Sequence, residues 1–156
     1  MKVGVIVCSY TNNTLCIAKE LRSGLIQKGY DVEIDSIKAN NDNPNNRDVE
    51  LAYKPKVDTF DALIFASCVR GFDCAPVFKE YINSLDSLSD KRVAGFVSQY
   101  FPLDILGGNQ ALKSMKDLVE KKKGVFTPLN SIHVKSKNKE KMITSLVEKS
   151  LVWLEF

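Results

Sequence analysis

The amino-acid sequence predicts an α/β fold in which helices cover both faces of a parallel five-stranded sheet. Strand-length apolar runs and amphipathic helix-length segments alternate five times along the chain, and this alternation favours parallel strands joined by helical crossovers. Right-handed crossovers leave few topologies, and we expect the strand order 2-1-3-4-5. The 156 residues are the length of one domain. We therefore expect a single three-layer, doubly wound domain over residues 1–156.

The expected strands differ in the spacing of their apolar residues. Residues 2–8 and 61–67 are near-continuous apolar runs, typical of strands buried on both faces, whereas residues 31–37 alternate as a half-exposed edge strand does. The remaining strands are expected at residues 92–98 and, after an irregular stretch over 125–130, at 131–135. Apolar stripes at helical spacing predict helices that follow the strands, within residues 15–28, 76–85, 111–124 and 143–154.

One segment, residues 38–59, lacks a sustained apolar period and is rich in Asn and Asp. We expect a long surface connection there, with one short helical turn near residues 48–53. Connections of this length are uncommon inside compact domains and are often functional or mobile. The segment contains no recognisable catalytic or binding motif.

Composition and charge exclude several classes of protein. The chain is 44% hydrophobic and 26% charged with a net charge of +3, which is ordinary for a soluble globular protein. No apolar run is long enough to cross a bilayer, and Lys2 leads directly into a strand rather than into a signal peptide. We therefore expect a cytoplasmic protein without membrane contact. The late lysines, such as those of residues 121–123, lack interleaved aromatic residues, so we expect a solvated face and no nucleic-acid partner.

The cysteines and the single histidine do not suggest a metal or catalytic site. Cys8, Cys16, Cys68 and Cys74 lack C-x-x-C spacing and a histidine cluster, which argues against zinc or iron–sulfur ligation. Cys8 and Cys68 should end adjacent strands, where buried packing is favoured over a redox-active pair. Cys74 is the most exposed candidate. We expect His133 on the last strand, away from the predicted site, and we assign no catalytic residue.

The end of the chain leaves two alternatives open. Trp153 and Phe156 continue the apolar stripe of the last helix. They would most simply pack on the sheet, and the alternative is a dimer contact.

The first turn, residues 9–14, is the clearest candidate binding loop. The segment Ser9-Tyr10-Thr11-Asn12-Asn13-Thr14 carries hydroxyls and amides but no charge, and it joins a buried strand to an amphipathic helix. A helix N-terminus offers unpaired N–H groups and a positive dipole end, so it can bind phosphate without a basic side chain. The alternative is that Thr11 or Asn13 simply caps the helix.

Two further loops, residues 67–75 and 98–109, should reach the same edge of the sheet. Ligands of such sheets bind outside the carboxyl ends of the strands, where the strand order reverses. The chain has neither a G-x-x-x-x-G-K-[ST] loop nor a G-x-G-x-x-G turn, which excludes a P-loop nucleotidase and disfavours a dinucleotide site. A phosphoacceptor receiver would need acidic residues where Cys8, Ser9 and Ser67 stand.

These three loops together resemble those of the flavodoxin-like family. Residues 9–14 are similar to the flavodoxin phosphate loop [ST]-x-T-G-x-T. Residues 61–67, followed by a Gly-containing loop and by Ala75-Pro76, resemble the second flavin loop. Residues 97–101, with 106–112 and Met115, are similar to the third loop of small flavodoxin-like proteins. The resemblance covers nearly the whole chain.

The resemblance implies FMN as cofactor. It implies phosphate binding in the first loop, and contacts to the isoalloxazine ring from the second and third loops. The implied cofactor-binding residues are Ser9, Tyr10, Thr11, Asn12, Asn13, Thr14, Ser67, Cys68, Val69, Arg70, Gly71, Gln99, Tyr100 and Phe101.

Some of these residues depart from the family pattern. Asn12 replaces the glycine of the phosphate loop, and Asn tolerates a left-handed conformation better than most residues. Cys68 and Arg70 stand where many relatives have Pro and an aromatic residue. Arg70 either stacks on the ring, neutralises its reduced anionic form, or is an ordinary surface arginine.

Three functions remain open at this point. The first is electron transfer through bound FMN to a redox partner protein. The second is an NAD(P)H-dependent FMN quinone or flavin reductase that acts on small acceptors. The third is a binding module that has lost FMN. The mild positive charge does not match the acidic surface of electron-transfer flavodoxins, and no nicotinamide site is identifiable.

Overall fold

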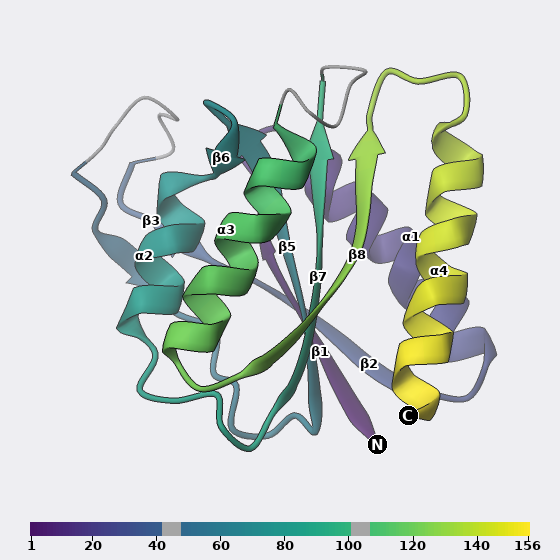
Figure 1. Cartoon of the computed structure of the whole chain (residues 1–156), viewed down its shortest axis with the longest axis horizontal. Coiled ribbons are helices and arrows are strands. Elements are labelled where there is room, and N and C mark those ends of the chain that lie inside the picture. The colour runs from purple at the N-terminus through teal and green to yellow at the C-terminus, as the bar shows by residue number, and fades with distance from the viewer. Residues whose placement is uncertain (42–47, 101–106) are drawn as a thin grey trace.

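The structure of the chain, a computed structural model, describes residues 1–41, 48–100 and 107–156 and has the predicted α/β architecture (Figure 1). Its elements in chain order are β1 (Lys2–Cys8), α1 (Asn13–Gln27), β2 (Asp31–Ser36), β3 (Lys38–Ala39), β4 (Leu51–Tyr53), β5 (Ala62–Arg70), β6 (Asp73–Cys74), α2 (Pro76–Ser84), β7 (Arg92–Gln99), α3 (Gly108–Lys121), β8 (Val125–His133) and α4 (Lys139–Glu155).

The five long strands form one parallel sheet in the order β2-β1-β5-β7-β8. This is the predicted order 2-1-3-4-5, because β5, β7 and β8 are the third, fourth and fifth of the expected strands. The strand order reverses between β1 and β5, which are hydrogen-bonded neighbours. The ligand-binding edge expected for such a sheet therefore lies at the carboxyl ends of β1, β5 and β7.

Two helices cover each face of this sheet. Helices α2 and α3 lie on one face and α1 and α4 on the other (Figure 1). The layer under α2 and α3 contains the aromatic cluster of Phe65 with Phe78 and Tyr81, whose rings meet edge to face at 5.7 and 6.5 Å. The other layer packs the valines of β1 against Ile17, Leu21 and the apolar stripe of α4. Both layers are built from buried apolar side chains, which fixes how the helices sit on the sheet.

The last strand is longer than expected. Residues 125–130 were predicted to be irregular, but β8 runs from Val125 to His133 and pairs with β7 along its length. The pairing shifts register between Gly95 and Val97, close to Pro128. Pro128 lacks an N–H group and is tolerated here because β8 is an edge strand. The proline and the irregularity together hid the strand from the sequence pattern.

The predicted helical turn near residues 48–53 is wrong. Leu51–Tyr53 forms β4, which pairs antiparallel with β3 in a separate two-stranded sheet. The Tyr53 hydroxyl donates a 2.5 Å hydrogen bond to Asp35 Oδ2 of β2 and so ties this small sheet to the main one. The segment 42–47, which the sequence placed in the same surface connection, lies outside the described residues.

Of the two C-terminal aromatic residues, only one packs on the sheet layer as the sequence predicted. Trp153 packs against the core layer under α4, and the Arg92 guanidinium lies 5.3 Å from its ring centre. Phe156 is 91% exposed and does not pack on the sheet. Within the described ranges, every helix is too short or too polar to span a lipid bilayer.

We expect the substitution Gly95→Ala to destabilise the protein. A Cβ atom at position 95 would overlap the Met115 sulfur and lie 2.9 Å from the Phe126 ring, so the Met115 and Phe126 side chains, or the elements that carry them, would have to shift. Overpacking of this kind costs about 1–3 kcal/mol, which urea denaturation can measure. The control is a double-mutant cycle with Met115→Ala, in which the Gly95→Ala cost should fall. An equal cost in both backgrounds would contradict the close-approach explanation.

Candidate cofactor-binding site

The first loop joins β1 to α1 through a left-handed residue. Asn12 is the N-cap of α1 and has a φ of 65°, the conformation that a glycine would adopt without strain. Its carbonyl accepts the first helical hydrogen bond from the Cys16 N–H at 2.9 Å. The expectation that Asn12 keeps the loop's backbone conformation in place of glycine is confirmed.

The N-terminus of α1 is not capped by a side chain in the described structure, so the capping alternative is wrong. The Thr11 hydroxyl instead accepts a 3.1 Å hydrogen bond from Asn13 Nδ2. The first turn of α1 also contains no acidic residue. The N–H groups and positive dipole end of this helix are therefore available to an anion.

Ser9 adds a hydroxyl to the same loop. Its Oγ is buried, and among the described residues no group forms a hydrogen bond with it. Buried hydroxyls almost always have a partner, and one without a partner needs an explanation. A bound phosphate oxygen would supply that partner.

Thr14 connects the first loop to the end of β7. Its hydroxyl lies 2.7 Å from the Ser98 hydroxyl in a buried hydrogen bond in which either oxygen can donate. Thr14 and Ser98 are 1% and 3% exposed. This contact locks the first turn of α1 against the sheet, so the first and third loops keep a fixed separation.

The second loop is a tight β-hairpin between β5 and β6. Gly71 and Phe72 have φ angles of 57° and 65°, as in the type I′ turns that suit two-residue hairpins. The Ser67 hydroxyl donates to the Cys68 carbonyl at 2.9 Å and accepts from the Ala75 N–H at 3.2 Å. Ser67 therefore serves the hairpin itself, and its side chain does not line the pocket described next.

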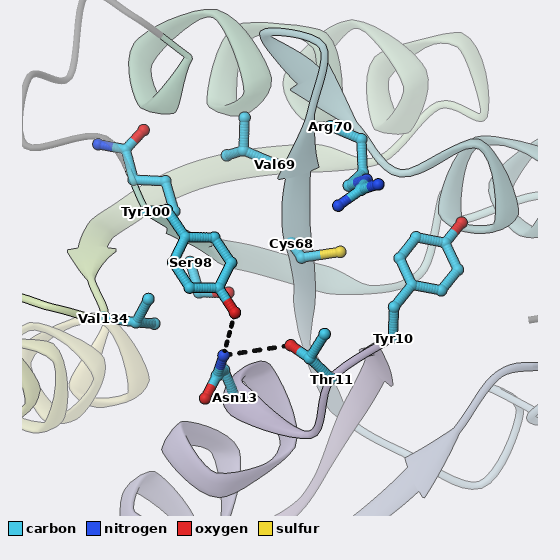
Figure 2. Close-up of a pocket in the computed structure, with 10 residues that line it drawn as sticks. Tyr10, Thr11, Asn13, Cys68, Val69, Arg70, Ser98, Tyr100 and Val134 are labelled. Atoms are coloured by element: carbon cyan, nitrogen blue, oxygen red, sulfur yellow. Dashed lines mark hydrogen bonds between the residues drawn. The ribbon is translucent and has the colours of Figure 1, made fainter. Parts of the chain in front are cut away.

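A pocket lies where the three loops meet, at the carboxyl edge of the sheet (Figure 2). Eight of the implied cofactor-binding residues line it, together with two residues outside that set: Ser98, at the start of the candidate loop 98–109, and Val134, which the sequence did not indicate. The lining residues are Tyr10, Thr11, Asn13, Cys68, Val69, Arg70, Ser98, Gln99, Tyr100 and Val134.

The other predicted residues lie around this pocket rather than on its wall. Ser9, Asn12 and Thr14 belong to the first loop, and Ser67 and Gly71 to the hairpin, whereas Phe101 lies outside the described residues. Ser98 was missed because it was counted as the end of a strand. Val134 was missed because the fifth strand was not considered part of the site, although the order 2-1-3-4-5 places its carboxyl end beside the third loop.

The Tyr100 ring closes one side of the pocket. Its hydroxyl accepts a 2.8 Å hydrogen bond from Asn13 Nδ2, the same amide that donates to Thr11 (Figure 2). The remaining space is about 20 Å³, which is room for one or two water molecules. A flat aromatic ligand can enter only if Tyr100, which is 50% exposed, turns away from Asn13.

Cations accompany the aromatic residues on both sides of the pocket. The Arg70 guanidinium lies 5.7 Å from the centre of the Tyr10 ring, and Lys135 Nζ lies 5.4 Å from the centre of the Tyr100 ring. Among the described residues, no carboxylate lines the pocket. The site is therefore neutral at the first loop and positive beside the second and third.

The thiols and the phenol beside the pocket are held protonated. Burial raises the pKa of Cys8 far above its ordinary value, and the nearby Cys68 thiol adds to the effect. Burial also raises the pKa of Cys68, although the Tyr10 N–H and the Arg70 guanidinium oppose the shift. Burial, with the nearby Cys8, raises the pKa of Tyr10 to about 12. Neutral thiols are weak nucleophiles, which agrees with a packing role for Cys8 and Cys68.

The prediction that Cys74 is the most exposed cysteine is wrong. Cys74 is 2% exposed, and its thiol donates to the Ala111 carbonyl at 3.2 Å. The hairpin turns the chain back under α3 and buries it. The exposed cysteine is Cys16, on the surface of α1.

His133 lies on the last strand, as expected, and is not among the residues that line the pocket, although its backbone lies nearer to the pocket than expected. His133 ends β8 and is the register partner of Gln99, which lines the pocket. The Val134 N–H donates to the Gln99 carbonyl at 2.9 Å. The strand therefore ends level with the third loop. In the described part of the chain, no group of His, Cys, Asp or Glu side chains is arranged to hold a metal ion.

Comparison with solved structures identifies the fold. Oxidised flavodoxin 2 from Bacillus cereus is similar over 99% of both chains, with a TM-score of 0.70 and 15% sequence identity. A flavodoxin from the domain Archaea covers 99% of both chains, with a TM-score of 0.66 and 16% identity. The chain has the flavodoxin-like fold.

The flavodoxin-like chain is also similar to a protein solved with a ligand. A flavoprotein in complex with FMN, from Lactobacillus acidophilus, matches 83% of this chain and 92% of its own, with a TM-score of 0.61 and 13% identity. No family model and no curated protein matches the sequence. At these identities the comparisons establish the architecture, and the chemistry has to be argued from the residues of the pocket.

We expect Asn12→Ala to destabilise this flavodoxin-like chain by about 1 kcal/mol, because an alanine pays the full strain of the left-handed conformation. Asn12→Gly, the matched variant, should remain within about 0.5 kcal/mol of the parent protein. Urea denaturation measures both free energies of unfolding. Equal destabilisation by the two substitutions would contradict a backbone role for this residue.

We expect one fast-reacting thiol in the native protein. Cys16 is exposed, whereas Cys8 and Cys74 are buried and held protonated, so Ellman's reagent should modify Cys16 first. The variant Cys16→Ser should lose the fast phase and keep the slow one. Cys68 is half-buried and lines the pocket, so a fast phase that persists in Cys16→Ser and is lost only when Cys74 is also replaced by serine would show that the hairpin does not bury Cys74 in solution.

Proposed function

We propose that the chain binds FMN at this pocket and transfers electrons through it. The observation that carries the proposal is the unpartnered, buried Ser9 hydroxyl beside the uncapped N-terminus of α1. Such a loop provides donors without negative charge, as a phosphate requires. The flavodoxin-like fold and its FMN-containing neighbour support the same cofactor.

At the phosphate end, the chain offers hydroxyls and N–H groups from one short loop. Ser9 would donate its free hydroxyl, and the first N–H groups of α1 would point at the phosphate oxygens. Thr14 retains a proton for the ligand when Ser98 is the donor in the hydrogen bond between them. The Thr11 hydroxyl already accepts from Asn13 and so has its own proton free to donate.

At the ring end, the flat surfaces come from the tyrosines and the donors from the hairpin backbone. Tyr10 and Tyr100 line the pocket, with the side chains of Val69 and Val134 between the loops. The Tyr100 ring, once turned away from Asn13, offers a stacking surface at the protein exterior. FMN supplies a ring that accepts and returns electrons, and these residues would bind it and exclude water from its inner edge.

We favour an electron carrier over a reductase because the ring side of the pocket opens beside an exposed aromatic residue. Tyr100 is 50% exposed, so the ring edge would lie where another protein can approach it. An NAD(P)H-dependent quinone or flavin reductase is the alternative. Stopped-flow mixing of the FMN-loaded protein with NADH or NADPH separates the two, since rapid flavin reduction without a partner supports the reductase.

We expect the substitution Ser9→Ala to weaken binding of FMN but not of riboflavin, because the Ser9 hydroxyl would contact only the phosphate. A lost hydrogen bond to a charged group costs about 1.5–3 kcal/mol, which is roughly a 10- to 100-fold loss of affinity. Quenching of flavin fluorescence measures both dissociation constants. Ser23→Ala is the matched control, because Ser23 lies on the exposed surface of α1. It should change neither the FMN nor the riboflavin dissociation constant.

Two results would contradict this proposal. The first is a parent protein that fails to retain flavin at micromolar FMN, which would favour a binding module without FMN. The second is an equal loss of FMN and riboflavin affinity in the Ser9→Ala variant, which would place the phosphate elsewhere.

A further inference from the structure

The mouth of the pocket carries positive charge on two separate elements. Arg70 comes from the end of β5, and Lys135 from the connection between β8 and α4, where Lys137 follows two residues later. Figure 2 shows Arg70 with Tyr10 at one side of the pocket and Tyr100 with Val134 at the other. The cations therefore flank the opening instead of converging on a point inside it.

Among the residues that the structure describes, no acidic group pairs with Arg70 or Lys135. The acidic residue of the hairpin, Asp73, is held by Lys79 at 2.8 Å. The aromatic faces of Tyr10 and Tyr100 fix the positions of the two cations without cancelling their charge. The positive potential therefore extends into the solvent in front of the pocket.

Exposed aromatic residues lie beside these cations: Tyr100 is in contact with Lys135, and Phe72 follows Arg70 in the hairpin turn. Tyr100 is 50% exposed and Phe72, at the tip of the hairpin, is 49% exposed. An aromatic centre with a charged rim is the usual composition of a protein interface. A small anion would instead need several donors pointing at one position, and the cations here are spread over two elements.

We propose that Arg70, Lys135 and Lys137, with Tyr100 and Phe72, form the docking surface for a negatively charged face of a redox partner protein. The proposal rests on the proposed function, because the partner would exchange electrons with the flavin at this edge. Opposite charges on the two proteins would steer the encounter and orient it. The sign of the charge on this surface requires that the partner's face be acidic.

The first test needs no flavin. The inert paramagnetic anion hexacyanochromate(III) is added to the isotope-labelled, flavin-free protein, and amide line broadening is recorded. We expect the strongest broadening at Arg70, Tyr100 and Lys135, and roughly a threefold reduction there in the double variant Arg70→Gln, Lys135→Gln. Broadening centred on the lysines of residues 121–123, at the opposite end of α3, would overturn the proposal.

The second test measures the electrostatic potential at the exposed edge of the flavin, where electrons would pass to an acceptor. One FMN, reduced by two electrons to its anionic form, gives one electron to each of two ferricyanide ions and one proton to solvent. We expect this oxidation to slow about tenfold when ionic strength rises from about 0.01 M to about 0.15 M. Oxidation by the cationic tris(phenanthroline)cobalt(III) should speed up over the same range.

A matched pair of variants separates local charge from net charge. Arg70→Gln and Lys121→Gln change the net charge equally, and Lys121 lies at the C-terminal end of α3. With saturating FMN, only Arg70→Gln should flatten the salt dependence. Equal effects of the two variants, or ferricyanide rates that rise with salt, would overturn the docking proposal even where FMN binding is confirmed.

A third test distinguishes an acidic protein face from a small anion as the ligand of this surface. Poly-glutamate should change the amide chemical shifts of both the hairpin and the β8–α4 connection. NADPH, added at the same concentration of charge, should change the chemical shifts of neither. Shifts caused by NADPH, accompanied by rapid flavin reduction, would overturn docking in favour of a nicotinamide site.

Discussion

The candidate site depends on the register of three parallel strands. Cys8 pairs with Ser67, and Cys68 pairs with Ser98, so β1, β5 and β7 end nearly level. Because parallel strands share one carboxyl edge, the turns that follow them must meet there. The buried hydrogen bond between Thr14 and Ser98 then fixes the first helix to the third of these strands. Without that register, no single loop has enough groups to hold a ligand.

Much of this arrangement could be predicted from local sequence. A near-continuous apolar run marks β1 and β5 as buried strands, and the alternation of residues 31–37 marks β2 as an edge strand, as observed. The strand order follows from general rules of connection rather than from any one residue. The backbone of the first loop could also be predicted, since Asn12 is one of the few residues that accepts the left-handed conformation found there.

The errors arose where tertiary structure overrides the local pattern. Pro128 interrupts the apolar pattern of β8, but the edge position of this strand makes the missing N–H harmless. Cys74 stands in a polar loop sequence, yet the hairpin turn at Gly71 and Phe72 folds it under α3. Val134 reaches the site only because β8 pairs with β7 up to Gln99. Each of these features depends on contacts with residues far away in the sequence, which the local pattern cannot indicate.

The two ends of the proposed ligand would meet different electrostatics, and this difference links the two proposals. The first loop offers the partial charge of a helix N-terminus, about half a unit, which suits a phosphate whose charge does not change. Arg70 and Lys135 offer full charges where the ring would gain negative charge on reduction. A unit charge about 6 Å away is worth roughly 1–3 kcal/mol, depending on the effective dielectric constant. The cations that would attract an acidic partner would therefore also stabilise the reduced ring, so the same residues would govern partner choice and electron affinity.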